Sequence, residues 1–210
     1  FSVATYTGNG TAGATVGHGL GAVPSMVIIK VRNAADNWPV YHASIGNANA
    51  MFLNTTAQSQ ALTYWNSTTP SSTVFTLGSN LVVNRSAATF VAYCFSEVSG
   101  YSKFGSYTGN GSSDGPFVNL GFRAKWILVQ CSSAGGNWIL HDTARSPSNV
   151  SSVHLRPNSS AAEDTGTGEY IDILSNGFKL RGTGGNINLN GGTFIYMAFA
   201  ENPFKNSLAR

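Results

Sequence analysis

Two short clusters of aromatic and polar residues stand at matching places in the two halves of the chain. The first is Trp38-Pro39-Val40-Tyr41-His42, and the second is Trp138-Ile139-Leu140-His141-Asp142 with Arg145 close behind. An indole ring can stack on the C–H face of a sugar while carboxylate and guanidinium groups bond to its hydroxyls. Both tryptophans also fit the role of core anchors at the same place in each half, and we favour that interpretation for the two rings.

Trp65 has no counterpart in the second half of the chain. An unrepeated aromatic residue in a loop is a better indication of a binding surface than a repeated one, because repeated positions are more often structural. We therefore expect Trp65 to present an aromatic surface. The candidate ligand-binding residues are Trp65, Tyr41, His42, His141, Asp142 and Arg145.

Carboxylates form no comparable pattern. A glycosidase needs two acids that converge in a cleft, and among the nine acids of the chain no pair stands out. Glu97 and Glu201 end equivalent segments, and a structural role such as pairing with arginine explains a repeated position better than catalysis does. The chain also lacks Gly-x-Ser-x-Gly, so serine hydrolysis has no support. We predict no catalytic residues and no enzyme.

Metal and cofactor sites are not expected either. The histidines lack the close spacing of zinc motifs; they are His18, His42, His141 and His154. The stretch Gly8-Asn9-Gly10-Thr11-Ala12-Gly13 spells the glycine pattern of dinucleotide-binding proteins. That chemistry needs a helix N-terminus after the turn, and the residues from Ala14 to Gly19 have no helical character.

Cys94 and Cys131 each lie inside an expected strand. A disulfide between them is geometrically possible, and spacing does not settle the question. We favour buried free thiols, because cysteine is among the residue types most often fully buried.

The elements that must position these residues are written twice. Thr89–Glu97 returns as Thr193–Glu201, and each copy is a β-branched and aromatic run without helical spacing. Such a run is typical of a strand. Alternate residues from Phe90 onward face one side and those from Val91 onward face the other. Because both sets are apolar, we expect a central strand that is covered on both faces.

The repeat extends beyond these strands. Tyr6–Gly10 returns as Tyr107–Gly111, and Met26–Lys30 returns as Trp126–Gln130. The repeating unit is therefore about 100 residues long, which indicates an internal duplication. The expected fold is all-β, with two tandem, similar antiparallel β-sandwich units of jelly-roll-like form over residues 1–100 and 101–210.

About eight short strands are expected in the first unit. They lie at residues 3–6, in a polar hairpin through His18, and at 26–32, 38–42, 51–54, 61–65, 73–77, 80–84 and 89–97. The segment 98–106 is short and partly apolar. We therefore expect the two units to pack against each other or to share sheets.

Charge and hydropathy exclude some classes of partner. Only 10% of residues are charged, and the net charge of +3 rests on twelve Lys and Arg residues that are scattered singly. A nucleic-acid groove would need them clustered, so no nucleic acid is expected. No run of eighteen apolar residues is present, so no membrane insertion is expected.

The chain begins at Phe1 without Met, and we expect a fragment or a processed piece of a longer protein.

Several phrases of the sequence resemble one known family. They include Tyr-Thr-Gly-Asn-Gly at 6–10, His-Gly-Leu-Gly at 18–21, Phe-Gly-Ser-Tyr-Thr-Gly-Asn-Gly-Ser at 104–112 and Ala-Phe-Ala-Glu-Asn-Pro-Phe at 198–204. They are similar to a repeat-containing domain of bacteriophage tail-fibre and other virion structural proteins, known chiefly from phages of marine bacteria and cyanobacteria. The resemblance covers almost the whole chain. Cys131-Ser132-Ser133 departs from it, because a charged residue is expected after that strand.

The resemblance implies an extracellular virion protein whose partners are other virion proteins and, since fibres are usually homotrimers, two further copies of itself. It carries over no catalytic or binding residues. Together with the few charges and many polar loops of the chain, the resemblance predicts a tail-fibre or adhesin-like module that recognises host-surface carbohydrate. Two alternatives stay open: a purely structural virion, decoration or fibre-shaft protein without a ligand, and, less favoured, a polysaccharide depolymerase that uses Asp142 or Glu169.

Overall fold

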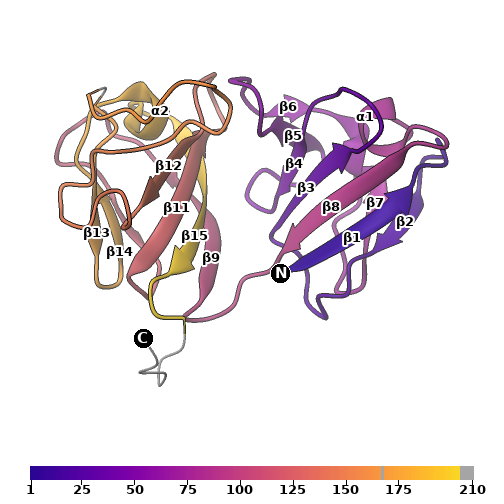
Figure 1. The fold of residues 1–210 in the computed structure, drawn as a ribbon, viewed down its shortest axis with the longest axis horizontal. Coiled ribbons are helices and arrows are strands. Elements are labelled where there is room, and N and C mark those ends of the chain that lie inside the picture. Colours follow the sequence, from indigo (N-terminus) through magenta and orange to yellow (C-terminus); the bar gives the residue numbers. More distant parts are fainter. Residues whose placement is uncertain (167, 204–210) are drawn as a thin grey trace. The chain divides into compact units, whose positions relative to one another are not determined.

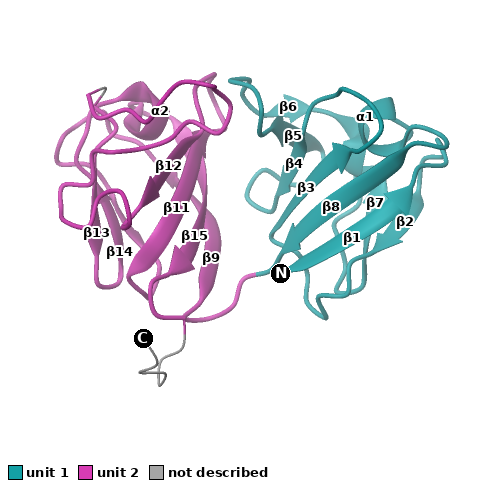
Figure 2. Cartoon of the chain, in the orientation of Figure 1, with its two compact units in different colours: residues 1–96 teal, residues 97–210 magenta. Residues whose placement is uncertain are grey.

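The structure is a computed structural model that describes residues 1–166 and 168–203. The chain divides into two compact units, Phe1–Ser96 and Glu97–Arg210 (Figure 2). Nearly all regular structure in both units is antiparallel β-sheet, which confirms the expected all-β class. No helix within the described ranges is both long and apolar enough to cross a membrane.

Unit 1 is built from a large sheet and a small one (Figure 1). The large sheet has the order β1-β8-β3-β4-β5-β6, and the small sheet pairs β2 with β7. In chain order these strands are β1 (Ser2–Thr7), β2 (Ala14–Gly17), β3 (Met26–Val31), β4 (Pro39–His42), β5 (Asn49–Phe52), β6 (Gln60–Ala61), β7 (Val74–Leu77) and β8 (Thr89–Phe95).

The core of unit 1 lies between these two sheets. Ile29 and Phe90 from the large sheet and Phe75 from the small sheet are all 0% exposed. Strand β8 is central, as expected, between β1 and β3. Its alternate residues from Phe90 are buried, but those from Val91 are only half-buried, so the expectation of two equally covered faces is wrong for this strand. The small sheet covers one face only.

Unit 2 has the same sandwich-like form. One sheet has the order β12-β11-β15-β9 and the other has the order β10-β14-β13. In chain order the strands are β9 (Ser102–Thr108), β10 (Phe117–Asn119), β11 (Ala124–Cys131), β12 (Ile139–Asp142), β13 (Ile171–Leu174), β14 (Gly177–Leu180) and β15 (Thr193–Ala200). Each sheet of the described residues lies within one unit, so the shared sheets that the short connection suggested are not found.

The segment 80–84, expected as a strand, is a helical turn instead. Helix α1 spans Leu81–Asn84, and the Asn80 side chain accepts a hydrogen bond from the Val82 backbone nitrogen at 2.9 Å. An asparagine in this position satisfies one of the free N–H groups of a helix start and so stabilises the turn. The expected strand at 61–65 is likewise short, since β6 ends at Ala61 and a 3-10 turn, η1, spans Thr63–Trp65.

The turn at α1 carries a buried asparagine that closes the glycine-rich turn after β1. Asn84 is 1% exposed. Its Oδ1 accepts from the backbone nitrogens of Asn9 and Gly10 at 2.9 and 3.3 Å, and its Nδ2 donates to the carbonyls of Thr11 and Gly78 at 2.9 Å each. The glycine pattern is thus a structural turn built around an amide, as the absence of a following helix indicates.

Unit 2 contains the same arrangement at helix α2 (Gly185–Asn188). Asn188 is 0% exposed, its Oδ1 accepts from the Asn110 backbone nitrogen at 2.9 Å, and its Nδ2 donates to Ser112 and Gly182 carbonyls at 2.8 and 2.9 Å. A tyrosine hydroxyl anchors each turn as well. Tyr6 donates to the Val83 carbonyl and Tyr107 to the Ile187 carbonyl, both at 2.7 Å.

Two smaller expectations are confirmed. Cys94 and Cys131 are free thiols, 0% and 1% exposed. Glu201 pairs with arginine, with its Oε2 2.9 Å from Nε of Arg123.

Candidate functional site

The residues that the sequence nominated in unit 1 belong to its core. Trp65 is 1% exposed, and its Nε1 donates to the Asn49 carbonyl at 2.9 Å. Tyr41 is 3% exposed and meets the Trp65 ring edge-on at 5.7 Å, and burial raises the pKa of its hydroxyl. His42 is 1% exposed. The expectation that Trp65 presents an aromatic surface is therefore wrong, because the 3-10 turn directs the ring inward.

The nominated residues of unit 2 are likewise engaged within the fold. His141 is 0% exposed and Asp142 is 7% exposed. Asp142 Oδ1 accepts from the backbone nitrogens of Ala144 and Arg145, and its Oδ2 forms an ion pair with Arg145. The Arg145 guanidinium also lies 3.2 Å from Glu163. Two acids thus pair with Arg145, and Asp142 and Arg145 brace the turn that follows β12.

A buried polar cluster surrounds His141. Its Nδ1 lies 3.1 Å from Ser151 Oγ, and its ring lies 5.6 Å from that of His154, which is also 0% exposed. Burial and, to a smaller extent, the neighbouring His154 lower the pKa of His141 to about 3, although the charge of Asp142 and a backbone hydrogen bond to Glu169 oppose this change. The described residues contain no group of three or more His, Cys, Asp or Glu side chains that could hold a metal ion.

The two acids that depolymerase chemistry would use are both buried. Glu169 is 2% exposed, and its Oε1 accepts from Asn186 at 2.7 Å. Asp142 is held by its own turn, as described above. A glycosidase carboxylate must reach the scissile bond, and neither group has that access in this conformation.

The tryptophans of the two clusters differ in exposure. Trp138 is 1% exposed, which confirms the expected core role. Trp38 is half-buried, and Nζ of Lys30 lies 5.7 Å from the centre of its ring.

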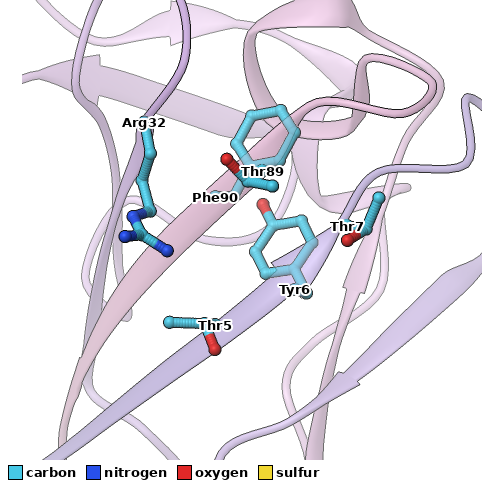
Figure 3. Close-up of a pocket in the computed structure, with 6 residues that line it drawn as sticks. All are labelled: Thr5, Tyr6, Thr7, Arg32, Thr89 and Phe90. Atoms are coloured by element: carbon cyan, nitrogen blue, oxygen red, sulfur yellow. The ribbon is translucent and has the colours of Figure 1, made fainter.

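A different region offers an accessible polar site. A hollow of about 350 Å³ opens on the outer face of the large sheet of unit 1, where β1, β8 and the end of β3 meet (Figure 3). Thr7 lies opposite Thr89 in the β1–β8 register. On the other side of Thr89 lies Arg32, whose backbone nitrogen donates to the Thr89 carbonyl at 2.7 Å. Thr5 shares this face with Thr7, since side chains two residues apart point the same way. Tyr6 and Phe90 complete the lining of the hollow.

The two aromatic residues of the lining are committed to the core. Their rings stack 4.9 Å apart with an angle of 6°, Phe90 is 0% exposed, and the Tyr6 hydroxyl donates to Val83. The three threonine hydroxyls, in contrast, make no hydrogen bond to any described residue. The chemical character of the hollow is thus set by hydroxyl groups and one guanidinium.

Arg32 is unusual among the arginines within residues 1–166 and 168–203. Its guanidinium makes no hydrogen bond or ion pair with the described residues. Every other described arginine pairs with a carboxylate; these are Arg85, Arg123, Arg145, Arg156 and Arg181. An exposed guanidinium with five unused N–H donors is a ready partner for an oxyanion.

The corresponding place in unit 2 keeps two of the three threonines and loses the charge. Thr193 lies opposite Thr108, and Ser132 follows on the far side, where its backbone nitrogen donates to the Thr193 carbonyl at 2.8 Å. Ser132 thus stands where unit 1 has Arg32. A separate hollow of about 270 Å³ in unit 2 is lined by uncharged residues, namely Ser99, Gly100, Gly121, Phe122 and Asn202.

Sequence reasoning did not nominate Arg32, Thr5, Thr7 or Thr89. One signal for Arg32 was present in the sequence, namely the missing charge at Cys131-Ser132-Ser133 after the equivalent strand. In the sequence this signal is a missing charge in unit 2, and it does not by itself point to Arg32 in unit 1.

Comparisons with known proteins give a family without an assigned activity. A family model described as a domain of unknown function, DUF7483, matches residues 1–203. No curated protein and no solved structure matches the chain. Because the match spans nearly the full sequence, the chain belongs to the DUF7483 family.

Proposed function

We propose that the chain is a non-catalytic recognition module that binds saccharide in the hollow of unit 1. The observation that carries this proposal is the set of three unused threonine hydroxyls beside the unused guanidinium of Arg32. Sugars present closely spaced hydroxyls, and threonine hydroxyls can both donate to and accept from them. Binding sites commonly place a few convergent polar groups on a rigid scaffold, here three neighbouring strands of one sheet.

The setting of this module comes from the sequence resemblance. We propose a virion as its location, with other virion proteins as neighbours, a homotrimer as its assembly and host-surface carbohydrate as its ligand. We also propose that the two sandwich-like units, of jelly-roll-like form, arose by duplication of one unit. The shared strand order and the equivalent bonds of Asn84 and Asn188 support that origin.

The burial of Asp142 and Glu169 counts against the depolymerase alternative. The purely structural alternative is a virion protein without a ligand. It predicts that no saccharide binds to the hollow, so a binding experiment distinguishes it from our proposal.

The test is a glycan array printed with bacterial lipopolysaccharide, capsular and exopolysaccharide fragments. We expect the purified chain to bind a subset of them, and the Thr7→Val and Thr89→Val variants to lose that binding. Valine keeps the β-branched shape and removes only the hydroxyl, so the fold is expected to persist. Thr108→Val, at the place in unit 2 that corresponds to Thr7, is the matched control and leaves binding unchanged. Absence of binding across the array, or binding that survives both hollow variants, contradicts the proposal.

A further inference from the structure

We infer that the hollow of unit 1 selects saccharides that carry an oxyanion, a carboxylate or a sulfate, over neutral ones. This inference rests on the proposed saccharide-binding function and names the class of its ligand. It starts from Arg32, the one described arginine without a carboxylate partner. A planar guanidinium can form two parallel hydrogen bonds to one carboxylate or sulfate, which neutral hydroxyls cannot match in strength.

The charge around Arg32 adds to this preference. Lys30 lies opposite Val91, which lies opposite Thr5, so its side chain emerges on the same face one row from Arg32. Its Nζ donates to the backbone carbonyl of Asp36 at 2.6 Å, a neutral acceptor that leaves the ammonium charge in place.

The carboxylate of Asp36, the residue whose backbone Lys30 contacts, is already neutralised. The Asp36 carboxylate forms an ion pair with Arg85 at 2.9 Å. The Asp36 carboxylate is therefore not available to compensate the two positive charges in these adjacent rows.

The hollow also lacks the feature that neutral sugars need most. Neutral saccharides gain much of their affinity by stacking on an exposed aromatic ring. Phe90 is fully buried, and Tyr6 is stacked against it with its hydroxyl bonded to Val83. Hydrogen bonds to neutral hydroxyls largely replace equivalent bonds to water, so the surplus affinity must come from charge-assisted bonds.

Unit 2 provides a comparison within the same chain. The row that holds Thr7, Thr89 and Arg32 in unit 1 holds Thr108, Thr193 and Ser132 in unit 2. The place of Lys30 is taken by Gln130, which lies opposite Ile195. Two of the three threonines are thus present twice, with Ser106 in the place of Thr5, and the cations are present once. The charge is therefore a property of one site and not a requirement of the fold.

The experiment uses the full chain on an array that carries uronate-containing, sulfated and neutral saccharides, with the best acidic ligand also tested after reduction of its carboxylates to alcohols. We expect binding to acidic members, loss on carboxylate reduction, and at least about tenfold weaker binding by Arg32→Ser. Arg32→Lys is expected to fall between wild type and Arg32→Ser, because lysine keeps the charge and lacks the planar fork. Lys125→Ser removes one exposed positive charge from unit 2 and is expected to bind within about twofold of wild type.

The outcomes separate this inference from the function on which it rests. Saccharide binding that prefers neutral members, or that is unchanged by Arg32→Ser, overturns the inference and leaves the proposed function standing. No saccharide binding at all overturns both. Equal binding to double-stranded DNA fragments, or an equal loss in Lys125→Ser, shows attraction of any polyanion and also overturns it. A comparison of the uronate-containing saccharides with the sulfated ones on the array then identifies which oxyanion the hollow binds.

Discussion

The backbone nitrogen of Arg32 donates to the carbonyl oxygen of Thr89 at 2.7 Å, one step beyond the last residue of β3. This bond continues the pairing of β3 with β8 and fixes the direction of the Arg32 side chain. The guanidinium therefore stands beside the threonines of the hollow and not in a loop of undefined direction. This one backbone hydrogen bond beyond the end of β3 thus places the Arg32 side chain in the proposed saccharide site.

The buried amide of Asn84 is expected to be a major stabilising group of unit 1. Asn84→Ala leaves the Asn9 nitrogen and the Gly78 carbonyl without their partner and removes one of two bonds from the Gly10 nitrogen and the Thr11 carbonyl. We expect a loss of about 2–4 kcal/mol in the free energy of unfolding. Asn9→Ala removes one exposed bond to the Thr11 nitrogen and is expected to cost under about 1 kcal/mol. Urea denaturation of both variants measures the difference. Equal, small costs would contradict the assigned role of Asn84.

The tyrosine anchors of the two units are expected to be worth similar amounts. Tyr6→Phe and Tyr107→Phe each leave one carbonyl without its donor, and we expect losses of about 1–2 kcal/mol in the respective units. Tyr93→Phe is the control, because the Tyr93 hydroxyl makes no hydrogen bond to the described residues. Hydrogen exchange followed unit by unit provides the measurement. A Tyr6 variant as stable as the Tyr93 variant would show that the anchor is not needed.

Acid is expected to destabilise unit 2 through His141. Burial lowers the pKa of His141 to about 3 in the folded chain, against an ordinary value of 6.5. The neutral form is favoured by folding, so stability is full above pH 6.5 and falls as pH drops toward 3, by up to about 1.4 kcal/mol per pH unit. His154, Asp142 and Glu169 surround the ring and stay in place in His141→Gln, which should flatten the slope. Hydrogen exchange in β12 and β13 between pH 7 and 4 tests this, and a His141 ring that titrates near pH 6.5 would refute it.

The thiol of Cys94 is expected to be inert in the folded chain. Burial raises its pKa to about 12, which outweighs the opposing charge of the N-terminus. Because thiolate is the reactive form, iodoacetamide at pH 8 should not label Cys94 in the native state. Full labelling is expected after unfolding in guanidinium. Rapid native-state labelling, measured by mass spectrometry of the peptide around Cys94, would contradict the packing of β8.

Much of the fold could be predicted because strand segments are recognisable in a sequence by their residue types and by alternating apolar and polar positions. The runs that became β3, β8 and β15 are β-branched and aromatic, and hydrophobic burial dictates their form. The segment 80–84 misled for a physical reason. Leu81-Val82-Val83 has strand-forming residues, but the cap at Asn80 and the buried bonds of Asn84 favour a helical turn.

The site could not be predicted in the same way. Trp65 and Tyr41 were nominated for their chemistry, but a large ring in a β-sandwich is stabilised most by burial, and both rings pack into the core. Arg32 looked like one of many scattered cations. Its importance appears only once the ion pairs of the other arginines are known, and those pairs join residues as far apart as Arg123 and Glu201.

The most direct test of the saccharide site is a methyl NMR titration of the full chain with the best acidic saccharide from the array. The account predicts that the methyl resonances of Thr5, Thr7 and Thr89 shift together and saturably. Those of Thr108 and Thr193, in the uncharged counterpart of unit 2, should stay in place. Shifts at Thr108 and Thr193 instead, or a ligand that binds while all three methyls of unit 1 remain unmoved, would contradict the claim that this hollow is the binding site.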